Sequence, residues 1–371
     1  MKINKFLYII MLFRRLISLD SLCAVLKIRR KPVTLQLPIT SRCNSRCVTC
    51  NVWKKNTKFD IDSNNLKECL TDPYFSKVKN VGINGGEFSL VKDFDRVLDA
   101  VLVLPRLKDI YIISNGLLPQ KILTILEYSK QKCEMNGIKL NFTLSVDGFG
   151  DVQNMVRGVP KAFKATQTIL DSLVDEPLKY AHSISIGSTL SIANIAYIRQ
   201  LETFLAKYPF PAHYHLAVPN KRIDTFSDSE KYYILCDEHS RMLAQEYFYN
   251  KFIETETIGK FSYFAQYYFL KNRGKGRLTS CQYKYKDLTI DESLNLYLCA
   301  TASEIVGDLN QTPASTLVTQ TNCRFVEQAV QKQCDTCIHY IYDEPTLKGL
   351  VCFISEIIKR RIDNCYKYER I

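Results

Sequence analysis

Short runs of apolar and β-branched residues alternate along most of the chain with longer stretches in which apolar residues recur every three or four positions. The short runs predict six strands, at residues 33–38, 78–83, 108–113, 139–146, 182–190 and 213–218. The longer stretches predict helices near residues 62–71, 92–104, 119–135, 160–174 and 191–208. Repeated alternation of strand and helix is typical of a parallel sheet with helices outside it. We therefore expect an α/β fold whose core, residues 33–220, is an open or closed parallel barrel.

The segments that flank this core have a different pattern. Residues 1–32 contain an apolar run at positions 6–13, which is too short to span a bilayer. This extension predicts an amphipathic helix that either lies on a membrane surface or packs against the main domain. Residues 221–280 are rich in tyrosine and phenylalanine and predict an aromatic helical linker, whose rings we expect to pack in the core. Residues 281–340 form a small cysteine-bearing domain, and residues 341–371 form a basic helical tail.

Composition and charge narrow the function only slightly. With 371 residues, of which 46% are apolar, the chain can bury a large core without disulfide bonds. The formal charge of +12 suits several kinds of anionic partner, and we expect a small molecule or a peptide and no nucleic acid. The fourteen cysteines are grouped at metal-ligand spacings, which indicates metal sites in a reducing, cytoplasmic setting. This location is compatible with peripheral contact at the inner membrane face through the N-terminal helix.

Polar and glycine-rich residues follow several predicted strands, where the loops of a parallel α/β fold form the active site. They are Gly85, Gly86 and Glu87 after the second strand, Ser114 and Asn115 after the third, and Ser145 and Asp147 at the end of the fourth. For Ser114, Asn115 and Asp147, ordinary turn chemistry is the alternative explanation. On the sixth strand, His213 and His215 alternate, so both side chains face one way. They are candidates for proton transfer beside a substrate, with structural histidines as the alternative.

Cys43, Cys47 and Cys50 lie in a loop directly after the first predicted strand. Three thiolates at this spacing can each ligate one iron of a 4Fe–4S cluster and leave the fourth iron open for a ligand. Electron-transfer clusters use four cysteines and close every position. A zinc site needs a fourth cysteine or histidine nearby, and apart from these three none lies between Cys23 and Cys69. The motif therefore favours an open iron–sulfur cluster.

This cysteine motif, followed after the second strand by Gly85-Gly86-Glu87, resembles the signature of the radical S-adenosylmethionine (SAM) superfamily. The resemblance extends over residues 33–340 and implies a partial (β/α)6-type parallel barrel. It implies a 4Fe–4S cluster on the three cysteines, whose open iron binds the amino and carboxylate groups of SAM. It also implies cleavage of SAM to a 5′-deoxyadenosyl radical that takes a hydrogen atom from the substrate, with an electron donor such as flavodoxin or ferredoxin.

The same resemblance implies SAM contacts at particular positions. The two glycines permit close approach of the backbone, Glu87 accepts from the methionine ammonium group, and Arg157 pairs with the SAM carboxylate through its planar fork of donors. Four further positions match family positions that contact or face SAM: Ser114, Asn115, Ser145 and Asp147. The chain departs from the family at Thr49, where an aromatic residue usually packs near the adenine. Trp53 supplies this ring or, alternatively, is a buried core tryptophan.

Four more thiols lie in the small C-terminal domain, at Cys281, Cys299, Cys334 and Cys337. Four ligands close a metal site completely, and their chemistry alone suits a 4Fe–4S cluster and a structural zinc equally. The surrounding segment, residues 291–309, resembles the auxiliary-cluster domain called SPASM in its shortened twitch form. The resemblance implies a single auxiliary 4Fe–4S cluster on these four cysteines.

Several positions of this domain differ from the full SPASM form. The full form has further cysteines where Asp343 and Leu347 stand here, and Leu294 replaces an expected glycine. Cys323 is a candidate substitute ligand, although a lone thiol is usually buried for packing. We assign the remaining cysteines to packing: Cys23, Cys69, Cys133, Cys236, Cys352 and Cys365.

The resemblance to twitch enzymes implies that the second cluster accepts or conducts electrons. Our leading hypothesis is hydrogen abstraction from a carbon of a polar, sugar-like metabolite, with net oxidation or epimerisation. The basic loop 271–277 either holds a phosphate of this substrate or is a solvated turn. One alternative is a radical SAM maturase of a ribosomal peptide or protein. The alternative from another class is a non-catalytic iron–sulfur or zinc-binding protein.

Overall fold

A single curved sheet forms the centre of the molecule in the computed structural model, which describes all residues except 1–4, 18–28, 257, 340–343 and 369–371. The strand order over the described residues is β6-β5-β4-β3-β2-β1-β7-β8-β9. The first six strands are parallel: β1 (Thr34–Pro38), β2 (Asn80–Asn84), β3 (Asp109–Ser114), β4 (Lys139–Ser145), β5 (Ser183–Leu190) and β6 (Ala212–Leu216). Each lies within two residues of a predicted strand. The predicted partial (β/α)6 barrel is therefore confirmed.

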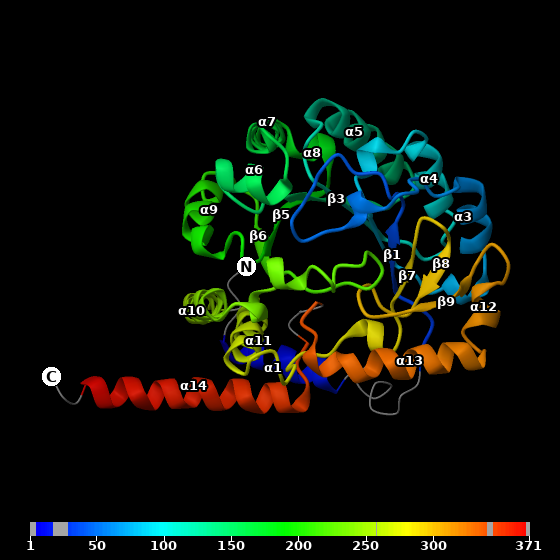
Figure 1. Ribbon diagram of the computed structural model, residues 1–371. Coiled ribbons are helices and arrows are strands. Elements are labelled where there is room, and N and C mark those ends of the chain that lie inside the picture. The colour runs from blue at the N-terminus through cyan, green and yellow to red at the C-terminus, as the bar shows by residue number, and fades with distance from the viewer. Residues whose placement is uncertain (1–4, 18–28, 257, 340–343, 369–371) are drawn as a thin grey trace.

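Helices cover the convex side of this sheet (Figure 1). They are α3 (Ser63–Leu70), α4 (Phe94–Val101), α5 (Pro119–Met135), α6 (Asp151–Arg157), α7 (Ala162–Asp175), α8 (Pro177–Tyr180) and α9 (Ile198–Leu205). The pattern of apolar residues missed α6 and α8, because helices of seven and four residues are too short to show a helical period. The other five lie within the predicted stretches, except that α7 extends one residue beyond its own.

The concave side of the sheet is mostly polar, with Ile113 on β3 as an exposed apolar residue. On β3, Ile110 and Ile112 are buried against the helices, whereas Tyr111 between them is 43% exposed on the other face. The concave face of the neighbouring strands carries hydrogen-bonded pairs of side chains, such as Thr143 with Ser185 at 2.9 Å and Thr189 with His215 at 3.0 Å. A barrel interior lined in this way offers hydrogen-bonding groups to a polar ligand.

The cysteine-bearing segment extends the same sheet. Strand β7 (Leu288–Ile290) pairs in parallel with β1, and β8 (Asn295–Tyr297) and β9 (Ile305–Asp308) follow as antiparallel neighbours. Helices α12 (Ala314–Leu317) and α13 (Thr321–Gln333) complete the segment. At the β7–β8 turn, Leu294 adopts φ +63°, the left-handed conformation that glycine adopts at low cost. The glycine that Leu294 replaces is thus one that the turn geometry favours.

The aromatic region 221–280 is helical only in its second part, where α10 (Glu238–Glu254) and α11 (Lys260–Lys271) pack together. The prediction of helix was wrong for residues 221–237, which form loops with two single 3-10 turns. Phe248, Phe252, Phe261 and Phe264 are all at most 2% exposed, so the rings form core as expected.

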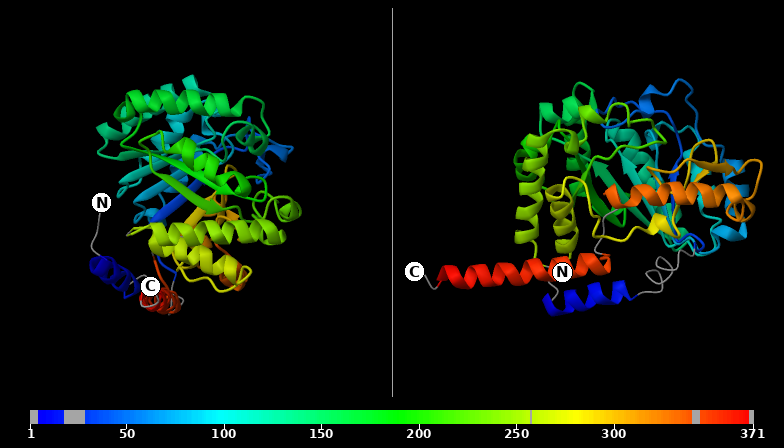
Figure 2. Two further views of the ribbon diagram at one scale, coloured as in Figure 1. Left: turned by 90° about the vertical axis from the view of Figure 1, so that its left-hand side faces the viewer. Right: turned by 60° about the horizontal axis from the view of Figure 1, so that its bottom comes forward.

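Helices α1 (Lys5–Leu16) and α14 (Leu347–Tyr368) lie side by side beneath the barrel, and α14 projects beyond it (Figure 2). Tyr8 and Phe353 join them by an edge-on ring contact at 6.5 Å. The predicted N-terminal and C-terminal helices are therefore present. None of the described helices is long and apolar enough to cross a membrane.

Candidate active site

The three cysteines of the first motif lie on the loop between β1 and a 3-10 turn at Val52–Lys54; we call residues 40–51 the cluster loop. The segment after β2 holds one end of this loop, because Gly86 N–H donates to Thr40 O at 2.7 Å and Glu87 N–H donates to Arg42 O at 2.8 Å. The two predicted glycine positions therefore serve close backbone approach to the cluster loop itself.

The C-terminal end of α6 holds the other end of the cluster loop. Arg46 N–H donates to Arg157 O at 2.7 Å, and Val48 N–H donates to Val156 O at 3.0 Å. Gly158 follows with φ +60°, and a Cβ atom there would lie 2.6 Å from Arg46 O. Two segments far apart in sequence thus fix the backbone that carries the cysteines.

Glu87 is 1% exposed, and its carboxylate accepts hydrogen bonds from protein groups. Ser114 Oγ donates to Oε1 at 2.8 Å, Ser89 Oγ donates to Oε1 at 2.9 Å, and Asn115 N–H donates to Oε2 at 2.8 Å. Burial raises the pKa of Glu87, while these donors oppose the shift. Glu87 therefore joins the ends of β2 and β3, and its contact with the SAM ammonium stays a prediction.

Asn115 reaches from the end of β3 to the cluster loop. Its Nδ2 donates to Asn44 Oδ1 at 2.8 Å and lies 3.8 Å from Cys43 Sγ. Ser114 is engaged by Glu87 instead. Both residues thus organise the site around the first cysteine, which places Asn115 beside the predicted cofactor position.

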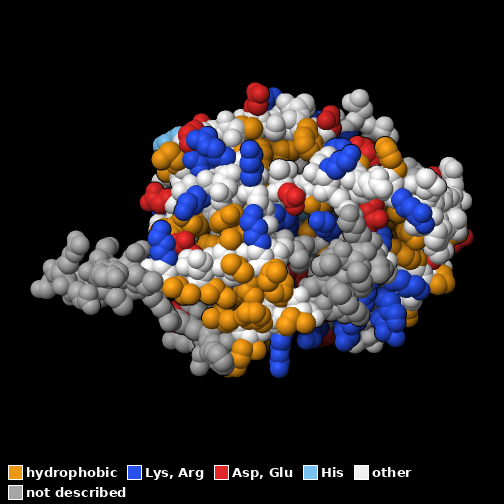
Figure 3. All heavy atoms as spheres, turned by 90° about the horizontal axis from the view of Figure 1, so that it is seen from below, with side chains coloured by type: hydrophobic (Ala, Val, Ile, Leu, Met, Phe, Trp, Pro, Cys, Tyr) orange, Lys and Arg blue, Asp and Glu red, His pale blue; other side chains and the backbone are white. Residues whose placement is uncertain are grey.

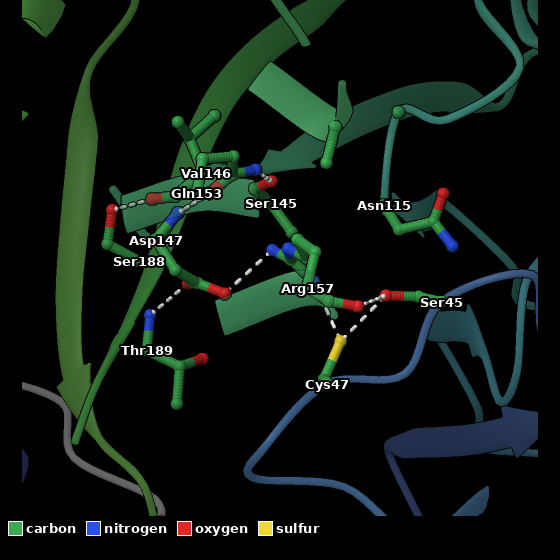
Figure 4. A network of polar contacts seen from close by, with 12 residues as sticks. Ser45, Cys47, Asn115, Ser145, Val146, Asp147, Gln153, Arg157, Ser188 and Thr189 are labelled. Carbon is green, nitrogen blue, oxygen red and sulfur yellow. Dashed lines mark hydrogen bonds and ion pairs between the residues drawn. The ribbon is translucent and has the colours of Figure 1, made fainter. Parts of the chain in front are cut away.

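Arg157 lies at the centre of the polar network in Figure 4. It is 6% exposed, and its Nη2 lies 2.8 Å from Asp147 Oδ2, while Nη1 lies 3.6 Å from Cys47 Sγ. Asp147 is held in turn by Thr189 N–H at 2.7 Å. Burial alone would lower the pKa of Arg157, but the Asp147 carboxylate raises it. The buried Nε has no hydrogen-bond partner in the described part of the chain, so Arg157 retains a donor for a carboxylate ligand.

Sequence reasoning missed two residues of this network. Ser45 Oγ donates to Arg157 O at 2.9 Å and lies 3.0 Å from Cys47 Sγ. Gln153 Oε1 accepts from Asp147 N–H at 2.8 Å. Ser45 stood inside the cysteine motif, but nothing in the pattern marked Gln153, because its contact joins α6 to the end of β4. Ser145 also lies here, as Figure 4 shows.

The donor set of the cluster loop fits an iron–sulfur cluster. Burial raises the pKa of the Cys43 thiol to about 12 and that of the Cys50 thiol to about 11, and the neighbouring cysteines add to both shifts. Three thiolates so placed repel one another until cations neutralise them. Trp53 is half-buried on the adjoining turn, and its indole N–H donates to Cys47 O at 3.4 Å. It is therefore a neighbour of the motif and not a buried core tryptophan.

The four C-terminal cysteines lie around one small hollow. The residues that line it include Cys281, Cys299, Cys334 and Cys337. Burial raises the pKa of Cys281 to about 12, and the three other cysteines interact with it electrostatically. Arg277 fixes the surrounding backbone, since its guanidinium donates to Thr279 O at 2.8 Å and to Cys337 O at 2.9 Å. Four thiols around one hollow are a donor set for a metal ion or a metal cluster.

Several other predictions concern this region. Cys323 is 2% exposed and does not line the hollow, so it packs instead. The assignment to packing was wrong for Cys236, which is exposed, whereas Cys133 is fully buried. Cys23 and Asp343 lie outside the described residues, as does the side chain of Cys365. In the basic loop 271–277, the guanidinium of Arg277 donates to backbone carbonyls of the cysteine segment, and phosphate binding by the rest of the loop stays a prediction.

His213 and His215 both face the concave interior of the barrel, as their alternation predicted. Removal of water around His215 lowers its pKa, which nearby Asp147 opposes. The pKa of His213 is lowered by the same cause. Both rings are exposed to the interior, where a ligand would lie. Their part in proton transfer stays a prediction.

Comparison with known proteins gives partial matches in sequence. No protein-family model matches the chain. A probable GTP 3′,8-cyclase of Archaeoglobus fulgidus is 27% identical over 187 residues, which are 45% of this chain and 60% of that protein. A GTP 3′,8-cyclase of Clostridium acetobutylicum is 28% identical over 141 residues, or 35% of this chain and 43% of that protein. The chain thus spans about half the length of the curated relatives it matches.

Solved structures resemble more of the chain. Streptococcus suis SuiB bound to S-adenosylmethionine has a TM-score of 0.56 and 16% identity, over 81% of this chain and 68% of that one. The enzyme anSMEcpe with bound AdoMet has a TM-score of 0.57 and 14% identity, over 82% of this chain and 86% of that one. Both neighbours are radical SAM enzymes. The chain therefore has the fold of these radical SAM enzymes, as the resemblance of its cysteine motif implied, while the SPASM-type auxiliary domain stays a prediction.

Proposed function

We propose that the protein is a radical SAM enzyme that abstracts a hydrogen atom from a carbon of a small polar substrate, with net oxidation or epimerisation. The observation that carries the proposal is the cluster loop. It presents three thiols beside a buried arginine that has a free donor, at the mouth of a polar barrel. The chemistry that a bound 4Fe–4S cluster and SAM supply there is reductive cleavage to methionine and a 5′-deoxyadenosyl radical.

The chain's own residues position these groups. Cys43, Cys47 and Cys50 hold the cluster, and Arg157 binds the SAM carboxylate through the donors that Asp147 leaves available. The concave face beyond them supplies hydroxyl and imidazole groups to orient the substrate. A flavodoxin or ferredoxin is the class of electron donor that such a cluster requires.

The four C-terminal cysteines hold an auxiliary 4Fe–4S cluster in this proposal. They line one hollow of the structure. A structural zinc on the same four thiolates is the alternative. The resemblance to the twitch form favours the cluster, which would accept or conduct the electron released in an oxidation.

Two substrate classes have support among the known proteins. The matched curated relatives are named as cyclases of GTP, a nucleoside triphosphate that contains a ribose sugar. Solved neighbours include SuiB with the precursor peptide SuiA and anSMEcpe with the Cp18Cys peptide. The polar concave face favours a small, sugar-like molecule, and a radical SAM maturase of a peptide or protein is the second candidate.

The testing experiment measures iron and SAM cleavage. After anaerobic reconstitution, we expect about eight irons per chain, falling to about four when Cys43, Cys47 and Cys50 are all changed to Ala. With SAM and dithionite, the wild-type protein forms 5′-deoxyadenosine and the triple variant does not. Bound iron without any 5′-deoxyadenosine would support a non-catalytic iron–sulfur protein. About four irons falling to none would mean that the C-terminal cysteines hold zinc or no metal.

We also propose that α1 touches a lipid surface. Tyr8 and Leu12 bury one side of the helix, while Leu7 is 56% and Phe13 42% exposed. Figure 3 shows apolar side chains gathered on this lower face, with lysine and arginine beside them. Changing Leu7 and Phe13 to Ser should abolish flotation with anionic vesicles, whereas Met135→Ser on α5 should not. Wild-type protein that stays out of the vesicle fraction refutes the proposal.

A further inference from the structure

The loop that follows β6, residues 220–228, contacts the chain beside both groups of cysteines; we call it the bridging loop. On the side of the cluster loop, Asn51 Nδ2 donates to Asp224 O at 2.6 Å and to Asp228 Oδ2 at 2.9 Å. Asn51 directly follows Cys50. The second half of the bridging loop is thus fixed next to the first group of cysteines.

The first half of the bridging loop is fixed next to the second group. Lys221 N–H donates to Thr301 O at 2.8 Å, and Asn220 Nδ2 donates to Ala300 O at 3.2 Å. Ala300 directly follows Cys299. A side chain between these two attachments therefore lies between the two predicted metal sites.

Arg222 is that side chain. Its Nε and Nη1 atoms are buried and have no hydrogen-bond partner, and no described carboxylate lies within ion-pair distance of it. Its backbone is fixed, since Arg222 N–H donates to Asn220 Oδ1 at 3.0 Å. A guanidinium stays charged in proteins, and leaving its donors buried without partners is costly. The position therefore calls for an anion that the chain itself does not supply.

Arg222 interacts electrostatically with residues beside both cysteine groups. On the side of the cluster loop it interacts with Cys50. On the other side it interacts with Tyr297, two residues before Cys299, and with His339, two residues after Cys337. The position of Arg222 on the bridging loop thus brings its charge near both groups of cysteines.

We infer that Arg222 binds a carboxylate or phosphate group of the substrate between the two predicted clusters. This inference rests on the proposed function and narrows its substrate class to anions. The SAM carboxylate already has a binding group in Arg157, which lies beside Cys47 on the other side of the cluster loop. Charged guanidinium donors without protein partners, such as Nε and Nη1 here, suit the oxygen atoms of either anion.

The test compares Arg222→Gln, which removes the charge, with Arg222→Lys, which keeps it. Arg96→Gln, on the exposed face of α4, is the control. Full-length, anaerobically reconstituted protein is titrated with inorganic pyrophosphate and with succinate in the presence of SAM. Iron content and SAM affinity are measured on every variant.

We expect wild-type protein to bind at least one probe, and the identity of that probe distinguishes phosphate from carboxylate. Arg222→Gln should weaken binding at least tenfold, Arg222→Lys should weaken it less, and Arg96→Gln should leave it unchanged. Iron content and SAM affinity should stay at wild-type values in all three. Equal binding by wild type and Arg222→Gln overturns the inference, as does a wild type that binds neither anion.

A loss of SAM affinity or iron in Arg222→Gln, with anion binding retained, would assign Arg222 to the cofactor and also overturn the inference. Failure of the proposed function has a different signature. It appears as absence of 5′-deoxyadenosine from the wild-type protein, whatever the anion titrations show.

Discussion

Replacing Gly86 by Ala tests whether the backbone contacts of the cluster loop are as close as the structure shows. Its φ is not positive, so the effect is steric only. A Cβ atom would lie 1.9 Å from Arg42 O and 2.5 Å from Arg42 C. The carbonyl must retreat by roughly 1.5 Å to restore ordinary contact, which breaks the Gly86–Thr40 and Glu87–Arg42 hydrogen bonds. Two such bonds at about 1 kcal/mol each, with an overpacking cost of about 1–3 kcal/mol, predict a loss of about 3–5 kcal/mol.

The assay combines urea unfolding, followed by circular dichroism, with iron content after reconstitution. Gly187→Ala is the matched control, because its φ is also not positive and its Cβ would meet only the Thr143 side chain, at 3.1 Å. We expect the control to lose less than about 1 kcal/mol and to load iron fully. Gly86→Ala should unfold at clearly lower urea and lose most of the iron that Cys43, Cys47 and Cys50 bind. A Gly86→Ala protein that matches Gly187→Ala in both measurements would refute the steric argument.

Three further predictions concern stability and reactivity. Tyr8→Phe should lower the free energy of unfolding by about 1–3 kcal/mol, because it removes the acceptor to which Phe261 N–H donates at 2.9 Å in a buried site. Leu7→Ala, at an exposed position, is the control, and equal unfolding midpoints for the two variants would contradict this prediction. Burial raises the pKa of Asp287 to about 6, so its protonated form stabilises the fold below pH 4. As the pH rises through 6 the carboxyl ionises, and the free energy of unfolding should fall by about 2–3 kcal/mol. Asp287→Asn keeps an acceptor for Thr34 N–H, so its advantage over wild type should grow from pH 4 to pH 7, and a constant difference in unfolding free energy counts against this reasoning. In folded protein, maleimide should label exposed Cys236 and spare buried Cys133, as read by peptide mapping; equal labelling rates would show that the exposures are wrong.

Local sequence patterns were sufficient for the strands and for the cysteine groups. Each strand has a buried side against helices and ends at a polar turn, so its period and its boundary are both encoded in neighbouring residues. The thiols of the first motif are close in sequence, whereas the second group, at positions 281, 299, 334 and 337, was assembled from the resemblance to the twitch form. The extra strands β7–β9 joining β1 were not predictable in this way, because the pairing of Leu35 with Leu288 depends on contacts between distant segments.

The roles within the site were harder to predict for the same reason. Glu87 looks like a free carboxylate in the sequence, yet Ser89, Ser114 and Asn115 occupy it. Gln153 has no sequence signal and supports Asp147 across the start of α6. A motif therefore predicts which groups are present, while burial and long-range hydrogen bonds decide which of them remain available to a ligand.

Some polar groups of this site remain free to bind a ligand and others do not, and this difference has a physical cause. The Cys43 and Cys50 thiols, whose pKa values burial raises, hold their protons near neutral pH, so metal uptake must displace these protons at a cost. A loop that also had to be ordered would add conformational entropy to this cost. The cluster loop avoids that addition, because four backbone hydrogen bonds to the β2 turn and to α6 fix it independently of any metal. Glu87 and Asp147 are consumed by this framework, and the donors left over are those of Arg157 and Arg222. The carboxylates of the site thus already have protein partners, while two arginines keep donors for ligands, which is the arrangement that anionic ligands require.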